Sequence, residues 1–237
     1  MSVVALIADA HLGGAGGPAD EMVEQLRALP SQGCERLILM GDIFHVWIGD
    51  RRFETEVIRR VFGALLALRQ QGMRIDYIEG NRDFFLARSP YAEAFTSIGS
   101  EVSLECPSGR YLVIHGDGLN DRDRQYLFWR WLSKSSLARA LMLNLPSRIA
   151  RWAVQRAETG LAKTNFRHRV GVPHAAITSY AERRLAAGHD ALLLGHFHRP
   201  ESWRVAGGEV RILDAWFNSR AVEWLDPSDI SDRVSDP

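Results

Sequence analysis

The chain has 237 residues, of which 46% are hydrophobic and 24% are charged, and its formal net charge at pH 7 is zero. This composition is typical of a soluble globular protein with one domain, or with one domain and a sizeable insertion, and it excludes a largely disordered chain. The two cysteines, Cys34 and Cys106, are too few for a disulfide framework, so we expect small buried thiols in a reducing compartment.

The N-terminal residues predict a first β-strand. The segment MSVVALIADAH lacks the basic region of a signal peptide, and it reaches Asp9 and His11 within eleven residues. No apolar run approaches the roughly 20 residues that cross a bilayer. We therefore expect a cytoplasmic protein.

The first half of the chain alternates strand and helix patterns. Apolar runs that end at polar residues predict buried strands, at residues 3–8, 36–40 and 74–79. Apolar residues at helical spacing predict helices at residues 18–29 and 54–71, and Gly72 ends the second helix.

The second half contains strands at both ends of a helical stretch. Strands are predicted at residues 101–105, 111–114 and 191–194, followed by closing antiparallel strands at residues 202–206, 209–215 and 221–225, with a hairpin turn at Gly207-Gly208. Between His115 and Ala191 there is no strand pattern. A helical stripe recurs there, at Leu137, Leu141, Leu145, Ile149 and Trp152, with a new helix beginning near Pro146 and another at residues 174–187.

The charge is unevenly distributed. Residues 120–185 hold 13 Lys and Arg but only four Asp and Glu, so the rest of this neutral chain is acidic. Such a basic segment can meet nucleic acid, anionic lipid or a phosphorylated ligand. The polar residues 227–237 predict a flexible tail.

Five predicted strands end in side chains that can bind a metal. The motifs are Asp9-x-His11, Gly41-Asp42, Gly80-Asn81-Arg82-Asp83, His115-Gly-Asp117 and Gly195-His196-x-His198. In open α/β sheets functional groups gather at the carboxyl ends of strands. In Asp9-x-His11 and His196-x-His198, one intervening residue places the two side chains of each motif on the same side of an extended segment. The glycines of the motifs let the backbone turn away sharply from the strand.

These residue types suit two neighbouring divalent cations. Imidazole combined with carboxylate and amide oxygen favours Mn, Fe or Zn over Ca or Mg. Taken singly, each motif has a simpler explanation, because an Asp-x-His pair is often a turn and His115 could be a hydrogen-bonded core histidine. All five in this order, each after an apolar run, are hard to obtain by chance.

The ordered set DxH, GD, GN, H and GHxH resembles the calcineurin-like metallophosphoesterases over residues 9–198. The resemblance implies an α/β fold, a two-sheet β-sandwich flanked by helices, with the site at the sheet edge. It implies one metal bound by Asp9, His11, Asp42 and His198, and a second bound by Asp42, Asn81, His115 and His196, with Asp42 shared. The catalytic set implied by the family comprises Asp42, Asn81, Arg82, His115 and His196.

Arg82 departs from the family pattern, in which a histidine usually follows the GN motif. An arginine cannot act as a general acid near neutral pH, but it can bind phosphate oxygens through two N–H groups. A phosphoanhydride substrate fits this change, because its leaving group needs no protonation.

Within that family, the segments GNRDFFL, HGDGL and GHFHRP resemble the bacterial UDP-2,3-diacylglucosamine hydrolases. Those enzymes release UMP and 2,3-diacylglucosamine 1-phosphate in the lipid A pathway, with Mn(II) as the usual metal. The resemblance implies a core of residues 1–120 and 188–226 and a helical cap of residues 121–187 that covers the site. Substrate contacts are implied for Asn81, Arg82, Asp123, Tyr126, Lys163, Asn165 and His196.

Other positions do not match. Leu161 and His168 stand where the family has a serine and a lysine, although Lys163, Arg167 or Arg169 could replace the lysine, and Phe197 stands where threonine is usual. The cap is basic and apolar, so it could bind the diphosphate, acyl chains or membrane headgroups, or it could be a small subdomain that packs on itself. We expect transient contact with an anionic inner-membrane surface, no nucleic acid and no obligate protein partner.

Three alternatives stay open. The chain could be a dinuclear-metal phosphodiesterase or pyrophosphatase that acts on another nucleotide or lipid diphosphate. It could be a binding module that keeps the fold without catalysis, although such modules usually lose metal ligands. It could also be a nuclease that uses its basic segment, which steep salt dependence of DNA binding would reveal.

Overall fold

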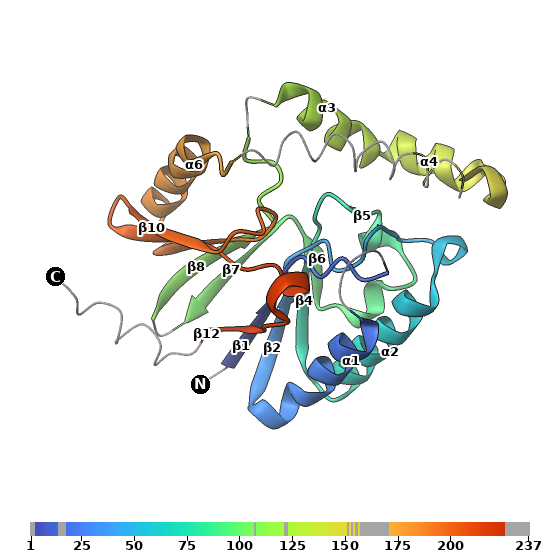
Figure 1. Cartoon of the computed structure of the whole chain (residues 1–237), viewed down its shortest axis with the longest axis horizontal. Coiled ribbons are helices and arrows are strands. Elements are labelled where there is room, and N and C mark those ends of the chain that lie inside the picture. Colours follow the sequence, from blue (N-terminus) through green and yellow to red (C-terminus); the bar gives the residue numbers. More distant parts are fainter. Residues whose placement is uncertain are drawn as a thin grey trace.

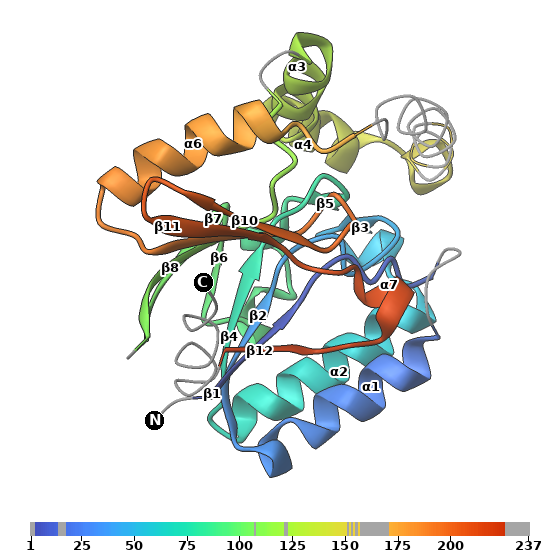
Figure 2. The ribbon, with the colours of Figure 1, turned by 60° about the vertical axis from the view of Figure 1, so that its left-hand side comes forward.

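Two five-stranded sheets pack face to face, and helices cover both outer faces (Figures 1 and 2). This is a computed structural model that describes residues 3–13, 18–106, 108–120, 123–150, 152, 154, 156 and 171–225. The predicted α/β architecture, a two-sheet sandwich flanked by helices, is confirmed. No helix in these ranges is long and apolar enough to cross a membrane.

The first sheet has the strand order β12-β1-β2-β4-β6. Its strands are β1 (Val3–Ile7), β2 (Cys34–Leu39), β4 (Arg74–Ile78), β6 (Ser97–Gly99) and β12 (Glu223–Leu225). The first four run parallel and only β12 is antiparallel to its neighbour β1. Helices α1 (Ala19–Ala28) and α2 (Glu56–Gln70) make the crossovers between β1, β2 and β4, so the carboxyl ends of these strands share one edge.

The second sheet has the strand order β10-β11-β9-β8-β7. Its strands are β7 (Glu101–Cys106), β8 (Gly109–Ile114), β9 (Ala191–Leu194), β10 (Glu201–Val205) and β11 (Gly208–Ile212). The predicted closing strands differ in two respects. Strand β11 is antiparallel to β10 but parallel to β9, and the hairpin turn falls on Ala206 and Gly207, both at positive φ, so that Gly208 already belongs to β11.

Smaller elements complete the chain. A two-residue parallel ribbon joins β3 (Trp47–Ile48) to β5 (Asp83–Phe84), and α7 (Trp216–Ser219) follows β11. Four short 3-10 helices lie at Pro30–Gln32, Arg51–Phe53, Leu86–Arg88 and Ala92–Ala94. The sequence pattern predicted none of these, because elements of two to four residues are too short to show a period.

Three apolar clusters hold the layers together. The first lies between the first sheet and helices α1 and α2, and contains the buried Trp47 and Trp216. The second fills the space between the sheets, where Leu6, Val113 and Leu193 meet. The third lies between the outer face of the second sheet and α6 (His174–Ala186).

Helix α6 belongs to the core by its packing. Residues 121–187 were predicted to form the cap, yet Ile177 and Ala181 of α6 are fully buried against Leu192 and Ile212 of the second sheet. We therefore assign α6 to the core layers. The helical pair α3 (Arg124–Ser133) and α4 (Ser136–Asn144) lies beside the sandwich, within the segment predicted to form the cap (Figure 1).

Polar contacts attach the helical pair to the core. The Arg130 guanidinium on α3 pairs with the buried Asp117, and Lys134 Nζ donates to the Gly80 carbonyl over 2.6 Å. From the core side, Arg52 donates to the Leu145 carbonyl just beyond α4 over 3.0 Å. All three contacts join charged side chains to groups near the carboxyl ends of strands or helices.

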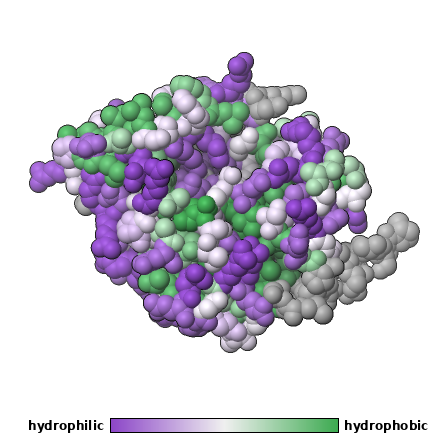
Figure 3. Space-filling model, turned by 180° about the vertical axis from the view of Figure 1, so that it is seen from behind, coloured by the Kyte–Doolittle hydropathy of each residue, from purple (hydrophilic) through white to green (hydrophobic). Residues whose placement is uncertain are grey.

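The apolar stripe of the cap faces outward. Leu137 is 64% exposed and Trp131 is 67% exposed, although large apolar residues usually lie inside. The other large apolar residues exposed here are Phe128, Trp129, Leu141, Ile149 and Trp152. Figure 3 shows apolar atoms gathered along the edge of the molecule over α3 and α4. Residues 147–150 are helical, as predicted from Pro146.

The assignment of α6 to the core is testable by unfolding in urea. Replacing Ile177 by Ala should lower the free energy of unfolding by about 2–5 kcal/mol, because three buried carbon atoms are lost and a cavity remains. The control Leu137→Ala, on the exposed cap stripe, should change it by no more than about 0.5 kcal/mol. Equal effects of the two substitutions would contradict this packing.

Candidate active site

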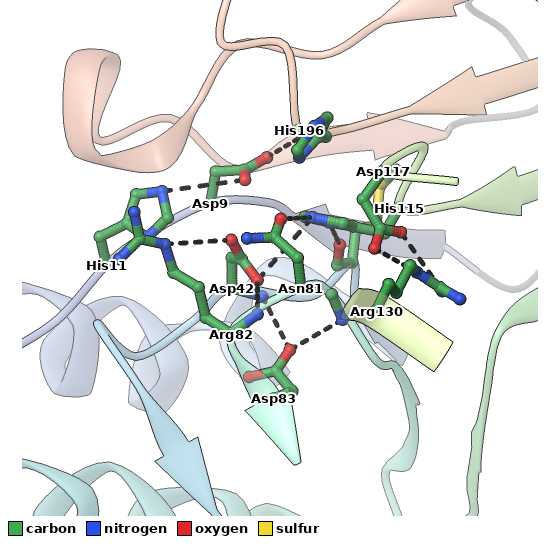
Figure 4. Close-up of polar contacts among 12 residues, drawn as sticks. Asp9, His11, Asp42, Asn81, Arg82, Asp83, His115, Asp117, Arg130 and His196 are labelled. Carbon is green, nitrogen blue, oxygen red and sulfur yellow. Dashed lines mark hydrogen bonds and ion pairs between the residues drawn. The ribbon is translucent and has the colours of Figure 1, made fainter. Parts of the chain in front are cut away.

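The five predicted strand ends meet at one edge of the sandwich. Asp9 and His11 follow β1, Asp42 follows β2, Asn81 and Arg82 follow β4, His115 follows β8, and His196 and His198 follow β9. Figure 4 shows most of these side chains turned toward one another. Asp9 and His115 are buried, and the others line a cavity of about 440 Å³, together with Asp123 and Tyr126 from the side of the predicted cap.

One group of donor atoms surrounds Asp9. Its Oδ1 lies 3.1 Å from His198 Nε2 and 4.0 Å from His11 Nε2, and the two imidazole nitrogens are 3.3 Å apart. Its Oδ2 accepts the backbone N–H of His196 over 2.7 Å. Asp9 is fully buried, so each of its oxygens faces protein nitrogen instead of water.

A second group surrounds His115. Its Nδ1 donates to the Met40 carbonyl over 2.7 Å, because a carbonyl can only accept. The neutral ring therefore carries no proton on Nε2, which lies 3.3 Å from Asn81 Oδ1 and 3.8 Å from Asp42 Oδ1. His115 Nε2, Asn81 Oδ1 and Asp42 Oδ1 each carry a lone pair, and these three atoms lie close together.

These donor atoms fit divalent cations. Asp9, His11 and His198 have ligand atoms within 4.8 Å of one another, and so do Asp9, Asp42 and His115. Converging acceptors repel one another unless a cation or proton lies between them. In addition, Nδ1 of His11 is buried without a hydrogen-bond partner in the described part of the chain. Carboxylate, amide and imidazole together suit first-row divalent metals.

Burial and the neighbouring carboxylates raise the pKa values of Asp42 and His115. Burial raises the pKa of Asp42 to about 7, and the carboxylates of Asp83 and Asp9 add to the shift. Burial opposes charge on His115, but Asp42 and Asp9 outweigh it and raise the pKa of His115. Both shifts have one origin, since the buried acceptors attract a positive charge that either a proton or a metal ion can supply.

Burial favours the neutral form of His11 and of His196. Burial lowers the pKa of His11 to about 3, although Asp9 opposes the shift. Burial also lowers the pKa of His196 to about 4, and the nearby His115 acts in the same direction. Neutral imidazoles keep a lone pair available near neutral pH, which is the form that binds a metal.

Five of the seven predicted ligands have left-handed backbone conformations. Among the described residues, eight that are not glycine have positive φ, and five of these are Asp9, His11, Asp42, His196 and His198. The spacing rule assumed an extended segment, so the side chains converge by another route. Each left-handed residue costs about 1–2 kcal/mol, and such strain concentrates at functional sites.

Gly41 and Gly80 allow two strand ends to touch. A Cβ on Gly41 would lie 2.6 Å from the Gly80 nitrogen and 2.9 Å from His115 Nδ1. A Cβ on Gly80 would collide with Asp42 Oδ1. The glycines therefore serve close backbone approach, and Gly41 also has a φ of 86°.

Asp83 is a site residue that the metal hypothesis did not include. It is fully buried, and its Oδ2 accepts the backbone N–H groups of Asp42 and Gly80, both over 2.9 Å. It thereby fixes two ligand-bearing loops to each other (Figure 4). Its place in the GNRD segment was visible in the sequence, but no pattern indicates that a carboxylate faces backbone amides.

Arg82 reaches across the same two loops. Its backbone N–H donates to Asp42 Oδ1 over 2.8 Å, and its Nε lies 3.5 Å from Asp42 Oδ2. Its Nη1 donates to the carbonyl of His45 over 3.1 Å and lies 3.3 Å from His45 Nδ1. His45 was not among the predicted site residues.

The cap side of the cavity carries the predicted contacts Asp123 and Tyr126. Asp123 caps the N-terminus of α3 by accepting the Tyr126 N–H over 2.9 Å. The Tyr126 hydroxyl donates to the buried Asp117 over 3.0 Å, and Arg130 Nε donates to the same carboxylate over 2.5 Å. His115 and Arg130 hold the pKa of Asp117 below its usual range against the effect of burial.

The remaining predicted positions divide into those outside the described residues and those at the cavity. Lys163 and Asn165 fall outside the described residues, as do Leu161, Arg167, His168 and Arg169. Phe197, at the usual threonine position, lines the cavity and packs on the His196 ring at a centroid distance of 5.2 Å. Phe217 also lines the cavity, and its ring packs on His198 at a centroid distance of 4.9 Å.

Comparison with known proteins gives the family. No protein-family model matches the sequence. Among solved structures, Vps29 of Chaetomium thermophilum has a TM-score of 0.47 and 10% identity, covering 92% of this chain and 73% of that one. A UDP-2,3-diacylglucosamine hydrolase of Aeromonas hydrophila is 29% identical over 223 residues, covering 91% of each chain. One of Ralstonia nicotianae is 32% identical over 228 residues, covering 90% of this chain and 83% of that protein. The chain belongs to the UDP-2,3-diacylglucosamine hydrolase family.

Proposed function

We propose that the protein hydrolyses UDP-2,3-diacylglucosamine to UMP and 2,3-diacylglucosamine 1-phosphate in lipid A biosynthesis, with two Mn(II) ions as cofactors. One observation carries the chemistry: the buried Asp9, Asp42 and His115 bring acceptor atoms within 4.8 Å of one another beside a cavity. The names of relatives that align with about nine-tenths of the chain support the substrate.

The proposed ligands divide into two sets that share Asp42. Asp9, His11, Asp42 and His198 would hold one ion, and Asp42, Asn81, His115 and His196 the other. The short distances around Asp9 and the lone pair on His115 Nε2 support this division. Asp9 also approaches Asp42 and His115 of the second set, so its charge would stabilise both ions. The mixture of nitrogen and oxygen donors favours Mn(II) over the harder cations.

Divalent cations held there supply positive charge beside the phosphoryl oxygens and make water a better nucleophile near neutral pH. The chain supplies orientation. Asn81 and Arg82 lie together at the cavity wall, where an amide and a guanidinium can donate to phosphate oxygens. Arg82 cannot protonate a leaving group, so a substrate whose leaving group is a sugar phosphate suits this site.

The cap would bind the lipid part of the substrate. Its outward apolar residues and its Lys and Arg suit acyl chains and anionic headgroups, and each buried CH₂ contributes about 0.8 kcal/mol. We propose transient contact with an anionic membrane surface, which would place a cytoplasmic protein peripherally on the inner membrane. Asp123 and Tyr126 would contact the sugar, and Lys163 and Asn165 would complete the cap contacts.

A related substrate is the alternative. Phe197 replaces the threonine expected from the resemblance, and its ring lines the cavity. This change in cavity shape favours a second candidate, hydrolysis of another nucleotide or lipid diphosphate by the same machinery.

Metal and substrate can be tested together. The chelated protein should be inactive, and Mn(II) should restore UMP release from UDP-2,3-diacylglucosamine better than Ca(II) does, because Ca(II) prefers oxygen-only sites. UMP is quantified by chromatography. Hydrolysis of simpler phosphodiesters without UMP release would reject the proposed substrate and support the alternative.

The shared carboxylate gives a second test. Asp42→Asn keeps the side-chain shape but removes the charge, so it should lower kcat more than about 100-fold, since even partners of metal ligands are worth about 10- to 100-fold. Bound Mn should fall in parallel, as measured by elemental analysis. The control Glu24→Gln, on an exposed position of α1, should leave both unchanged. Full activity of Asp42→Asn would exclude a shared ligand at this position.

Membrane contact can be tested with vesicles. Replacing both Trp131 and Leu141 by Ser should lower the binding constant for phosphatidylglycerol vesicles, measured by sedimentation, by at least about tenfold. Burying one large apolar side chain contributes about 1.5–3 kcal/mol. Stability in urea should change little, since both side chains are exposed. Neutral phosphatidylcholine vesicles should bind less protein. Equal binding of the wild type and the variant would show that this surface does not meet the membrane.

A further inference from the structure

The guanidinium of Arg82 is held on two of its three nitrogens. Nε faces Asp42 Oδ2 at 3.5 Å, and Nη1 faces the His45 carbonyl at 3.1 Å and His45 Nδ1 at 3.3 Å. Nη2 makes no hydrogen bond within the described part of the chain. Arg82 lines the cavity, and its side chain is 17% exposed. Nε and Nη1 therefore each face a protein acceptor, and the two N–H groups of Nη2 are left for a ligand.

The contact with His45 defines the state of its ring. An arginine is always protonated and can only donate, so Nδ1 of His45 accepts, and the proton of the neutral ring lies on Nε2. One residue thus offers Arg82 two acceptors, a backbone oxygen and a ring nitrogen.

The backbone around His45 is fixed independently of its side chain. The His45 N–H donates to the Leu12 carbonyl over 2.8 Å, and Trp47 N–H donates to the Arg82 carbonyl over 2.8 Å. These bonds tie the loop after β2 to the loops after β1 and β4. The ring itself is half-buried and does not line the cavity. These two backbone bonds do not involve the ring, so we expect the loop to keep them when the ring is removed.

The position of Arg82 matters because Asp42 competes for it. A guanidinium and a carboxylate pair most strongly in a two-point geometry, and Arg82 already approaches Asp42 with both its backbone N–H and its Nε. A closer pair would neutralise the carboxylate that the proposed metal ions share. It would also turn the remaining N–H groups away from a phosphate. The carbonyl and Nδ1 of His45 attract Nη1 away from Asp42.

We propose that His45 is a positioning residue, which holds the Arg82 guanidinium off Asp42 so that Nη2 can bind the phosphoryl oxygens of the substrate. The proposal rests on the proposed function, in which Arg82 binds phosphate. The proposed role runs through Arg82, and this separates it from a role that merely supports the fold.

A double-mutant cycle tests this coupling. Variants H45A, H45N, R82A and H45A/R82A are assayed with saturating Mn(II) on UDP-2,3-diacylglucosamine and on bis(p-nitrophenyl) phosphate. H45A should lower kcat/KM about tenfold, mainly through KM, as expected for one hydrogen bond to a charged group. H45N should stay within about threefold of the wild type, because its amide can place an oxygen where Nδ1 lies. H45A/R82A should be no worse than R82A.

Three results would overturn the proposal: an H45A variant as active as the wild type, additive effects of H45A and R82A, or loss of bound Mn in H45A. The third would show that His45 acts on the metal centre. Thermal unfolding of H45A and H45N checks that both variants fold. If the wild type cleaves only bis(p-nitrophenyl) phosphate, the proposed substrate is rejected, while the cycle on that ester still decides the role of His45.

Discussion

The structure depends on bringing two buried carboxylates and the lone pairs of several imidazoles to one point. Asp9 is fully buried and Asp42 is 2% exposed, and unpaired charge at such depth is costly. Hydrogen bonds from backbone N–H groups to Asp9 and Asp42 offset part of this cost, and Met40 fixes the proton of His115. The remaining acceptors face one another. A divalent cation between them is the group that satisfies all of them at once.

This requirement explains the backbone around the site. Parallel strands carry their carboxyl ends to one edge, but a strand end by itself spreads side chains apart. The left-handed residues at Asp9, Asp42 and His196 turn the chain sharply, and Gly41 and Gly80 let two turns touch. The strain is supported by the three apolar clusters of the layers, which lie behind the edge. The apolar layers of the sandwich therefore stabilise the fold, and the left-handed residues of the candidate site lie at its edge.

Sequence patterns predicted the long elements well and the contacts poorly. Strand β9 was predicted residue for residue, and α2 to within two residues, because long apolar runs show a clear period. The ordered motifs brought together the seven proposed ligands, since strand ends share an edge. Asp83 and His45 were missed because their partners are backbone groups and an arginine, which leave no periodic pattern. The packing of α6 on the second sheet was not predicted, because a helical pattern shows which side of the helix is apolar but not which surface that side contacts.

The cap is coupled to the site by the way it is attached. In the described residues its helical pair has no buried large apolar side chain, so polar contacts carry much of its docking. Two of these contacts end on the site itself: Lys134 binds the carbonyl of Gly80, which precedes Asn81, and Arg130 binds Asp117, two residues after His115. A cap that shifted would pull on both loops. Asp117 thereby joins the strand end at His115 to α3 through an ion pair with Arg130. If α3 and α4 bind the lipid as proposed, Lys134 and Arg130 would link lipid binding to the strand ends of the site.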